Sequence, residues 1–190
     1  MDLQRPIAFS LLMLIPLFGL CDADYDRCVD QYLAGTEASI EVFEEIASAG
    51  DANSQYCVGV AYHEGKGVDR DPATAIEWYL KAGQKGHLEA QYWLCLMYRE
   101  GMGVTPNALE SLYWCKRAAK EKHPSALYAL GQWYYDGHGR NKFTDHINAY
   151  IWFSRAAAAG EDAGADMIRM LENQMTDLQI IEARKLAESR

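Results

Sequence analysis

The sequence is short of basic residues and contains no Cys-x-x-Cys motif. Its 190 residues include 18 Lys and Arg against 27 Asp and Glu, which gives a formal net charge of −9. Nucleic-acid phosphates and anionic lipids both require clustered Lys and Arg, so this balance argues against either as a partner. Without Cys-x-x-Cys, neither a zinc ribbon nor a thioredoxin-type redox site is supported. Apolar residues make up 49% of the chain, which is enough for a packed core.

One uncharged apolar run, Ile7–Leu20, lies near the N-terminus. As a helix its 14 residues cover about 21 Å, short of the roughly 30 Å hydrocarbon core of a bilayer. Pro16 would also interrupt that helix. Small residues at Cys21 and Ala23 then fit a small-x-small cleavage site. We therefore predict that residues 1–23 are a secretory signal peptide and that the mature chain has no membrane span.

Two other interpretations of this segment stay open. The run could be an uncleaved N-terminal anchor, or Cys21 could carry a lipid, although Leu20 is larger than the residue expected before a lipidated cysteine. Export in any of these forms would expose the chain to an oxidising compartment, where disulfides persist. Four cysteines remain after cleavage: Cys28, Cys57, Cys95 and Cys115.

The pattern Tyr-x-acidic-Gly-x-Gly occurs three times at a step of 36 residues. It reads YHEGKGV from Tyr62, YREGMGV from Tyr98 and YYDGHGR from Tyr134. Other aromatic residues recur with it, and the third unit has two extra residues before its tryptophan: Tyr56, Tyr92 and Tyr128 precede the pattern, and Trp78, Trp114 and Trp152 follow it. A long period held three times is typical of stacked repeat proteins.

Each unit has the pattern of two helices joined at the glycines. Apolar spacing predicts a first helix that Gly65 ends, because glycine is favoured just beyond a helix C-terminus. Asp71 then provides an N-cap for a second helix with proline at its first position. Asn107 and Asp145 hold the same predicted capping position in the other units. A phosphate-binding loop is excluded, because it needs a preceding strand and the sequence shows no strand pattern.

These stretches resemble the Sel1-like repeat family, which is related to the tetratricopeptide repeats. The resemblance rests on AQYWLCLMYREGMGV from Ala90 and AIEWYLKAGQKG from Ala75, and it covers roughly residues 36–164. It implies an all-α fold, a right-handed α-solenoid of stacked antiparallel helix pairs. Two positions depart from the family pattern: Cys95 replaces a glycine, and Arg140 replaces a valine.

The units suggest a domain organisation. Residues 24–51 are predicted to form N-terminal capping helices, residues 52–164 three repeats, and residues 165–190 C-terminal capping helices. Thr176 and Gln179 have the spacing of a capping box. The charged last helix would give the solenoid the polar end that it requires.

The cysteines suggest two disulfides. Cys95 and Cys115 fall at similar heights on the two antiparallel helices of one unit, and a bond between them would join those helices. Cys28 and Cys57 fall on adjacent first helices and could form a second bond. Buried free thiols are the alternative.

No catalytic or metal-binding group is visible in the sequence. Glu64, Glu100 and Asp136 are repeated carboxylates rather than a close pair, which disfavours general acid–base catalysis. His87 and His123 are equivalent positions about 10 Å apart, too far to share a metal that needs ligands at about 2.1 Å. We therefore predict no enzyme activity, no metal and no cofactor, with the histidines as exposed loop residues: His63, His87, His123, His138 and His146.

The resemblance points to a partner-binding surface. In such solenoids the first helices line the concave face, where a protein or peptide binds. The predicted contact residues form ladders on that face: Tyr56, Val60, His63, Glu64, Tyr92, Leu96, Arg99, Glu100, Tyr128, Gln132, Tyr135 and Asp136. The alternative for the tyrosines is a place in the core. The three tryptophans are predicted to be core residues.

The expected function follows from this resemblance. We expect an exported, non-catalytic scaffold for protein–protein or protein–peptide interaction in the bacterial envelope, periplasmic or secreted. One alternative is a peptidoglycan or β-lactam binder or hydrolase of the cysteine-rich Sel1-like type, with a cell-wall component as its partner. Those relatives carry a cysteine pair in each unit, which this chain lacks. A structural subunit of an envelope complex is a third possibility.

Overall fold

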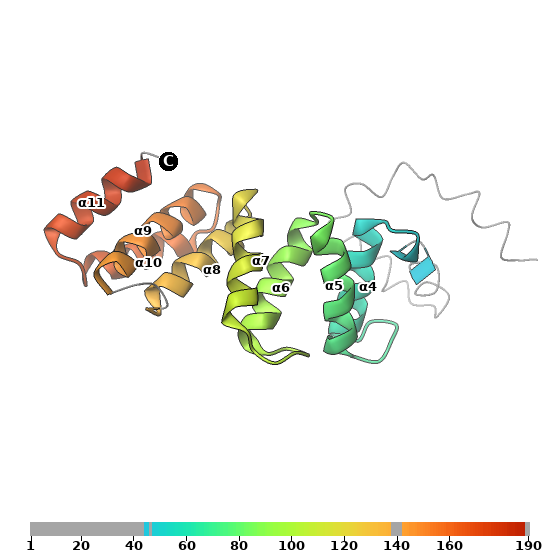
Figure 1. Ribbon diagram of the computed structural model, residues 1–190. Coiled ribbons are helices and arrows are strands. Elements are labelled where there is room, and N and C mark those ends of the chain that lie inside the picture. The colour runs from blue at the N-terminus through green and yellow to red at the C-terminus, as the bar shows by residue number, and fades with distance from the viewer. Residues whose placement is uncertain (1–43, 46, 138–141, 189–190) are drawn as a thin grey trace, which may run out of the picture.

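The computed structural model describes residues 44–188 except residue 46 and residues 138–141. The predicted signal peptide, most of the predicted N-terminal capping segment (24–43 and 46), Cys28, His138 and Arg140 lie outside the described residues. Within them the chain is all-helical, as predicted, and no strand is present. Figure 1 shows the helices stacked one after another in an elongated array: α4 (Ala52–Glu64), α5 (Pro72–Gln84), α6 (Leu88–Glu100), α7 (Ala108–Lys120), α8 (Pro124–Tyr135), α9 (Lys142–Ala158), α10 (Ala163–Glu172) and α11 (Asp177–Glu188).

The helices pack as three consecutive pairs, α4 with α5, α6 with α7, and α8 with α9. Each pair also packs against the next through its second helix, α5 on α6 and α7 on α8. Helices α10 and α11 both pack against α9 and continue the array at its C-terminal end. None of the described helices is long and apolar enough to cross a membrane.

The repeated glycines form the corner inside the first two pairs, α4 with α5 and α6 with α7. Gly101 ends α6 in the left-handed region (φ 74°), and its N–H donates to the Met97 carbonyl at 2.9 Å. The Asn107 N–H then donates to the Tyr98 carbonyl at 2.8 Å, which brings the start of α7 back to the end of α6. The first unit has the same pair of bonds. The second glycine, Gly103 (φ 73°), lies directly against the backbone of Pro72 in the preceding unit.

The second helices begin as predicted in two of the three units. Asp71 accepts hydrogen bonds from the first N–H groups of α5, and Asn107 does the same for α7. The prediction for Asp145 is wrong. Helix α9 begins at Lys142, so Asp145 lies inside its first turn and is buried. The two residues inserted in this unit allow the helix to start earlier.

Two histidines cap helices and join neighbouring units. The Nδ1 atom of His87 accepts from the Ala90 N–H at 3.3 Å at the start of α6, and its ring stacks on Tyr56 with centroids 4.4 Å apart. His123 caps α8 in the same way, and its ring stacks on Tyr92 at 4.8 Å. The prediction of exposed loop histidines is therefore wrong for both residues, because each ring is held between a cap and an aromatic neighbour. It is also wrong for His63 and His146, which are buried within α4 and α9.

The loss of folding stability at acid pH is expected to depend on His87. Burial lowers the pKa of His87 below its ordinary value. The unfolded chain therefore takes up a proton at higher pH than the folded chain. The free energy of unfolding should be level above about pH 6.5 and fall as the pH drops toward the lowered pKa.

This fall can be measured by urea unfolding at about pH 7 and about pH 5. Asn is a good N-cap that does not titrate, so His87→Asn should keep the helix start and lose part of the acid sensitivity. Burial also lowers the pKa of His63. His63 should therefore account for part of the acid sensitivity that remains in His87→Asn. An unchanged pH dependence in His87→Asn would contradict this account.

In the first and third pairs, one contact between the two helices, here called the seam, joins a glycine on the first helix to an aromatic residue on the second. A Cβ atom added to Gly59 would lie 2.7 Å from the Tyr79 ring, and one added to Gly131 would lie 2.5 Å from the Phe153 ring. The middle unit has Cys95 at the glycine position, and the structure joins it to Cys115 in a disulfide. The disulfide therefore takes the place of a glycine–aromatic contact.

The tryptophans occupy a less buried position than predicted. Trp114 is buried, but Trp78 and Trp152 are only half-buried. A basic side chain three residues later lies over each ring: Lys81 over Trp78, Arg117 over Trp114 and Arg155 over Trp152. The prediction of a core ladder is correct for Trp114 alone, because the other rings keep one face toward a cation and solvent.

The C-terminal helices have the predicted cap but a less polar surface. The Thr176 N–H donates to the Gln179 side-chain oxygen at 2.9 Å, and the Gln179 N–H donates back to the Thr176 hydroxyl at 3.4 Å. This is the predicted capping box at the start of α11. Leu178 and Ile181 are 77% and 64% exposed, so the end of the array is not uniformly polar.

Candidate functional site

The predicted contact residues on the first helix of the first unit are mostly interior. Tyr56, Val60 and His63 are 1%, 4% and 8% exposed. The His63 ring meets the Trp93 ring edge-on at 4.6 Å, so the next unit covers it. The prediction that these three residues contact a partner is therefore wrong. Glu64, at the end of α4, is half-buried and pairs with Lys66 at 2.8 Å.

The predicted contact residues on α6, and two of those on α8, remain accessible. These two helices contact each other. The Arg99 Nη1 atom donates to the Gln132 side-chain oxygen at 3.2 Å across the two helices, and Arg99 Nε donates to Glu100 at 2.7 Å. Arg99 and Glu100 are exposed, and the others are half-buried. We call this set the first-helix surface: Tyr92, Leu96, Arg99, Glu100, Tyr128 and Gln132.

The two tyrosines of this surface are anchored on one side. The Tyr92 ring stacks on His123, and burial raises the pKa of its hydroxyl. The Tyr128 ring packs against Phe153 with centroids 5.3 Å apart. Each ring is thus fixed by the core while part of it stays accessible. Pre-positioned aromatic side chains of this kind lose little conformational entropy when a partner binds.

Tyr135, one of the last two predicted contact residues, contacts the C-terminal region instead of standing free. The Tyr135 hydroxyl accepts a hydrogen bond from the Gln174 side chain at 3.2 Å, and its ring stacks near His146 at 6.4 Å. Asp136 is exposed and forms the C-cap of α8. These contacts turn Tyr135 toward the α10–α11 junction.

The repeated carboxylates do not converge. Glu64 pairs with Lys66, Glu100 pairs with Arg99, and Asp136 caps α8 through its backbone. Among the residues that the structure describes, no group of three or more His, Cys, Asp or Glu side chains is placed to hold a metal ion.

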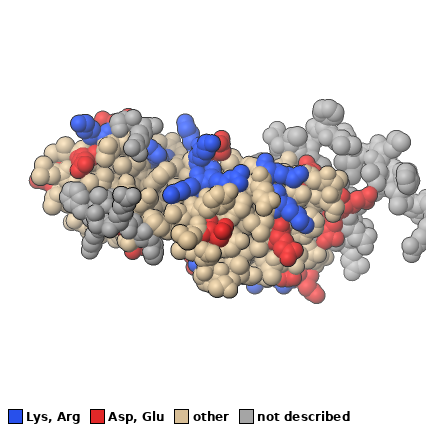
Figure 2. All heavy atoms as spheres, viewed as in Figure 1, with Lys and Arg blue, Asp and Glu red and all other residues tan. Residues whose placement is uncertain are grey.

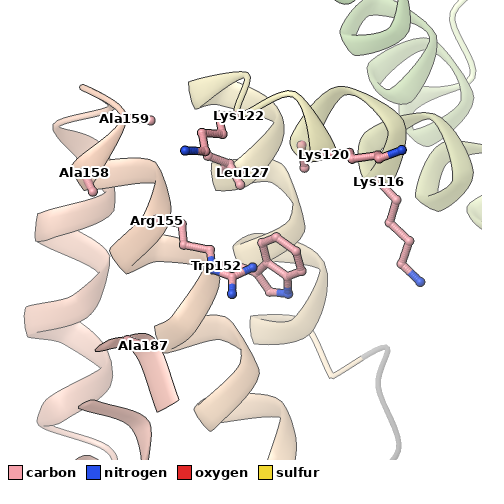
Figure 3. A pocket seen from close by; sticks show the side chains of 10 residues that line it. Lys116, Lys120, Lys122, Leu127, Trp152, Arg155, Ala158, Ala159 and Ala187 are labelled. Atoms are coloured by element: carbon pink, nitrogen blue, oxygen red, sulfur yellow. The ribbon is translucent and has the colours of Figure 1, made fainter. Parts of the chain in front are cut away.

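A second accessible feature, which sequence reasoning missed, is a groove where the second and third helix pairs meet α11. It has a volume of about 680 Å³ and is lined from α7, α8, α9 and α11. Figure 3 shows its basic side chains and Trp152, and Figure 2 shows Lys and Arg gathered at the level of α7 and α8. Four of the seven residues at positions 116–122 are basic, and this cluster was the signal in the sequence that could have predicted the groove.

The sequence matches the Sel1 repeat family model in three consecutive copies, residues 52–87, 88–123 and 124–161. These copies cover more than half of the chain. The chain belongs to the Sel1 repeat family. Each copy contains one of the helix pairs described above.

Solved structures of Sel1 repeat proteins share the fold. A Sel1 repeat protein from Oxalobacter formigenes is 27% identical, with a TM-score of 0.65, over 73% of this chain and 54% of that one. The protein c5321, a protective antigen of uropathogenic Escherichia coli with the same repeat fold, is 30% identical, with a TM-score of 0.67, over 77% of this chain and 33% of that one. This chain thus spans only about a third to a half of their lengths. No curated protein sequence matches it.

The Sel1 repeats of this chain do not have the cysteine-rich form. Only the middle repeat places cysteines at both seam positions, whereas the outer repeats have Gly59 with Tyr79 and Gly131 with Phe153. Cys57 is also disulfide-bonded, and Cys28, its predicted partner, lies outside the described residues. The one repeat-internal disulfide of the described part therefore joins α6 to α7.

Proposed function

We propose that this Sel1 repeat chain is an exported, non-catalytic scaffold that binds another protein or a peptide in the bacterial envelope. The observation that carries this proposal is the first-helix surface, where anchored tyrosines stand beside the exposed Arg99. Tyr and Arg are over-represented among the residues that dominate binding energy at protein interfaces. We infer from the resemblance to related solenoids that this surface is the concave face, where such proteins bind partners.

Two observations support a place outside the cytoplasm. Cys57, Cys95 and Cys115 are all disulfide-bonded, and such bonds persist in oxidising compartments. The structural neighbour from uropathogenic Escherichia coli is a protective antigen, which is in keeping with an envelope or secreted location for this chain.

The binding proposal can be tested by affinity capture from envelope extract. The test variant is Arg99→Glu with Gln132→Ala, which reverses one charge and removes the hydrogen bond between α6 and α8. Arg99 is exposed, Gln132 is half-buried, and the bond between them joins side chains only, so circular dichroism should be unchanged. The control is Lys81→Glu, which makes the same charge reversal on α5, away from the first-helix surface.

A protein retained by the parent chain and by the control should be reduced at least about tenfold on the test variant, the effect of losing a hot-spot residue. Equal retention by all three baits would place the binding surface elsewhere. The absence of any retained protein would contradict the scaffold proposal.

A further inference from the structure

The groove beside α7 concentrates positive charge in an acidic protein. Its described lining includes Lys116, Lys120, Lys122 and Arg155 and no acidic residue. The chain as a whole has a formal net charge of −9. Side chains of one sign in a hollow focus the electrostatic field there and attract the opposite charge. The groove is therefore a local site for a negatively charged group.

The fold itself does not require these lysines. The repeats provide an internal comparison, because the same helix positions occur in all three units. The counterparts of Lys116, Lys120 and Lys122 in the outer units are uncharged: Leu80 and Ser154, Gln84 and Ala158, Gly86 and Gly160. The three lysines are thus a feature of the middle unit rather than of the repeat.

Lys122 is held in a conformation that disfavours a side chain. Its φ is 62°, and it is the one non-glycine residue with positive φ in the described part of the chain. Its counterparts Gly86 and Gly160 have φ values of 97° and 98°. Glycine is the residue preferred at this position beyond a helix end, because L side chains are strained there. A strained lysine at a glycine position points to a role other than folding.

The groove also offers an apolar surface. Trp152 is half-buried in its wall, and the Arg155 guanidinium lies 4.8 Å from the ring centroid. Leu127 and several alanines complete the lining. Figure 3 shows Arg155 beside Trp152, with the lysines on α7 and on the turn that follows it. A ligand here would meet cations and an aromatic ring together.

We propose that this groove binds a short acidic peptide segment of a protein partner. Its carboxylates would pair with Lys116, Lys120 and Lys122, and an apolar side chain would rest on Trp152. The volume of about 680 Å³ is that of a pocket for a compact ligand. A nucleic-acid duplex or a bilayer would extend past the lysines and would meet the rest of a chain whose formal net charge is −9. The site is separate from the first-helix surface and does not depend on it.

The probe for this site is a fluorescein-labelled peptide in which glutamates alternate with leucines. Its matched control replaces every glutamate with glutamine. Fluorescence anisotropy measures binding to the full chain. The glutamate peptide should bind at least about tenfold more tightly, and its affinity should fall as salt is raised, because exposed charges are screened.

Two matched variants distinguish binding in the groove from a general effect of the net charge. Lys120→Gln with Lys122→Gly removes two positive charges and restores the glycine of the other units. Lys66→Gln with Lys85→Gln removes two charges outside the groove. The first variant should lose at least about tenfold in affinity for the acidic peptide while its Tm is unchanged or raised, since the strain at position 122 is relieved. The second should bind as the parent chain does.

Several outcomes would overturn the proposal. One is equal binding of the glutamate and glutamine peptides, or no binding of either. Another is equal loss of affinity in both variants, which would reduce the effect to net charge. A third is tighter binding of duplex DNA or of anionic phospholipid vesicles through the same lysines, which would assign the groove to a different class of partner.

Discussion

Replacing both Cys95 and Cys115 with alanine is expected to lower the free energy of unfolding by about 3 kcal/mol. The bond closes a loop with a sequence separation of 20 and joins α6 to α7 in the middle of the array. Without it, the unfolded chain gains conformational freedom, and the folded seam loses its only covalent link. Urea unfolding of the oxidised parent and the double variant measures the difference.

The equivalent seams of the outer units suggest a replacement that restores packing. Cys95→Gly with Cys115→Phe would copy Gly131 with Phe153, where the ring fills the space beside the glycine. This variant should recover a substantial part of the lost stability. A result no better than the double alanine variant would contradict the equivalence of the three seams. So would a double alanine variant as stable as the parent.

Gly103→Ala is expected to lower the free energy of unfolding by at least about 3 kcal/mol. Gly103 has a φ of 73°, and an added Cβ would lie 2.4 Å from the Pro72 carbonyl carbon. That atom belongs to the backbone at the start of α5, so it cannot move aside without shifting the helix. The second glycine of the repeated motif is thus required by contact between units. Urea unfolding measures the change.

Gly86→Ala separates this contact from backbone strain. Gly86 also has a positive φ, of 97°, but an added Cβ would meet nothing within 4 Å. Gly86→Ala should lower the free energy of unfolding by about 1 kcal/mol, because a side chain is strained at that φ. Equal losses in the two variants would show that the close approach to Pro72 contributes nothing.

The helix pairs were predictable because their signals are local. Gly101 ends a helix and Asn107 caps the next through bonds between residues close in the sequence, and the 36-residue step repeats these signals. Asp145 was not predictable in the same way. The inserted residues let α9 begin at Lys142, and no local signal marks that change.

Exposure was harder to predict, because it depends on neighbouring units. Tyr56 and Tyr92 occupy equivalent positions, yet the first is buried and the second is half-buried. His63 is buried against Trp93 of the next unit. The stacking of His87 on Tyr56 joins two units, and only the folded array brings those rings together.

The basic groove was not anticipated because net charge is a property of the whole chain. A value of −9 describes the balance of the sequence and not where its cations lie. The position-by-position comparison of the units could have found the three lysines of the middle unit. Lys122 at a glycine position was the clearest of these signals, although its φ became known only from the structure.

The first-helix surface is proposed to bind a protein partner. Hydrogen–deuterium exchange of the full chain, alone and with its captured partner, tests it most directly. Binding at this surface should slow exchange in α6 and α8, over residues 88–100 and 124–135, and should cause no such slowing in Arg99→Glu with Gln132→Ala. Slower exchange confined to α5 and α10, with α6 and α8 unchanged, would contradict it.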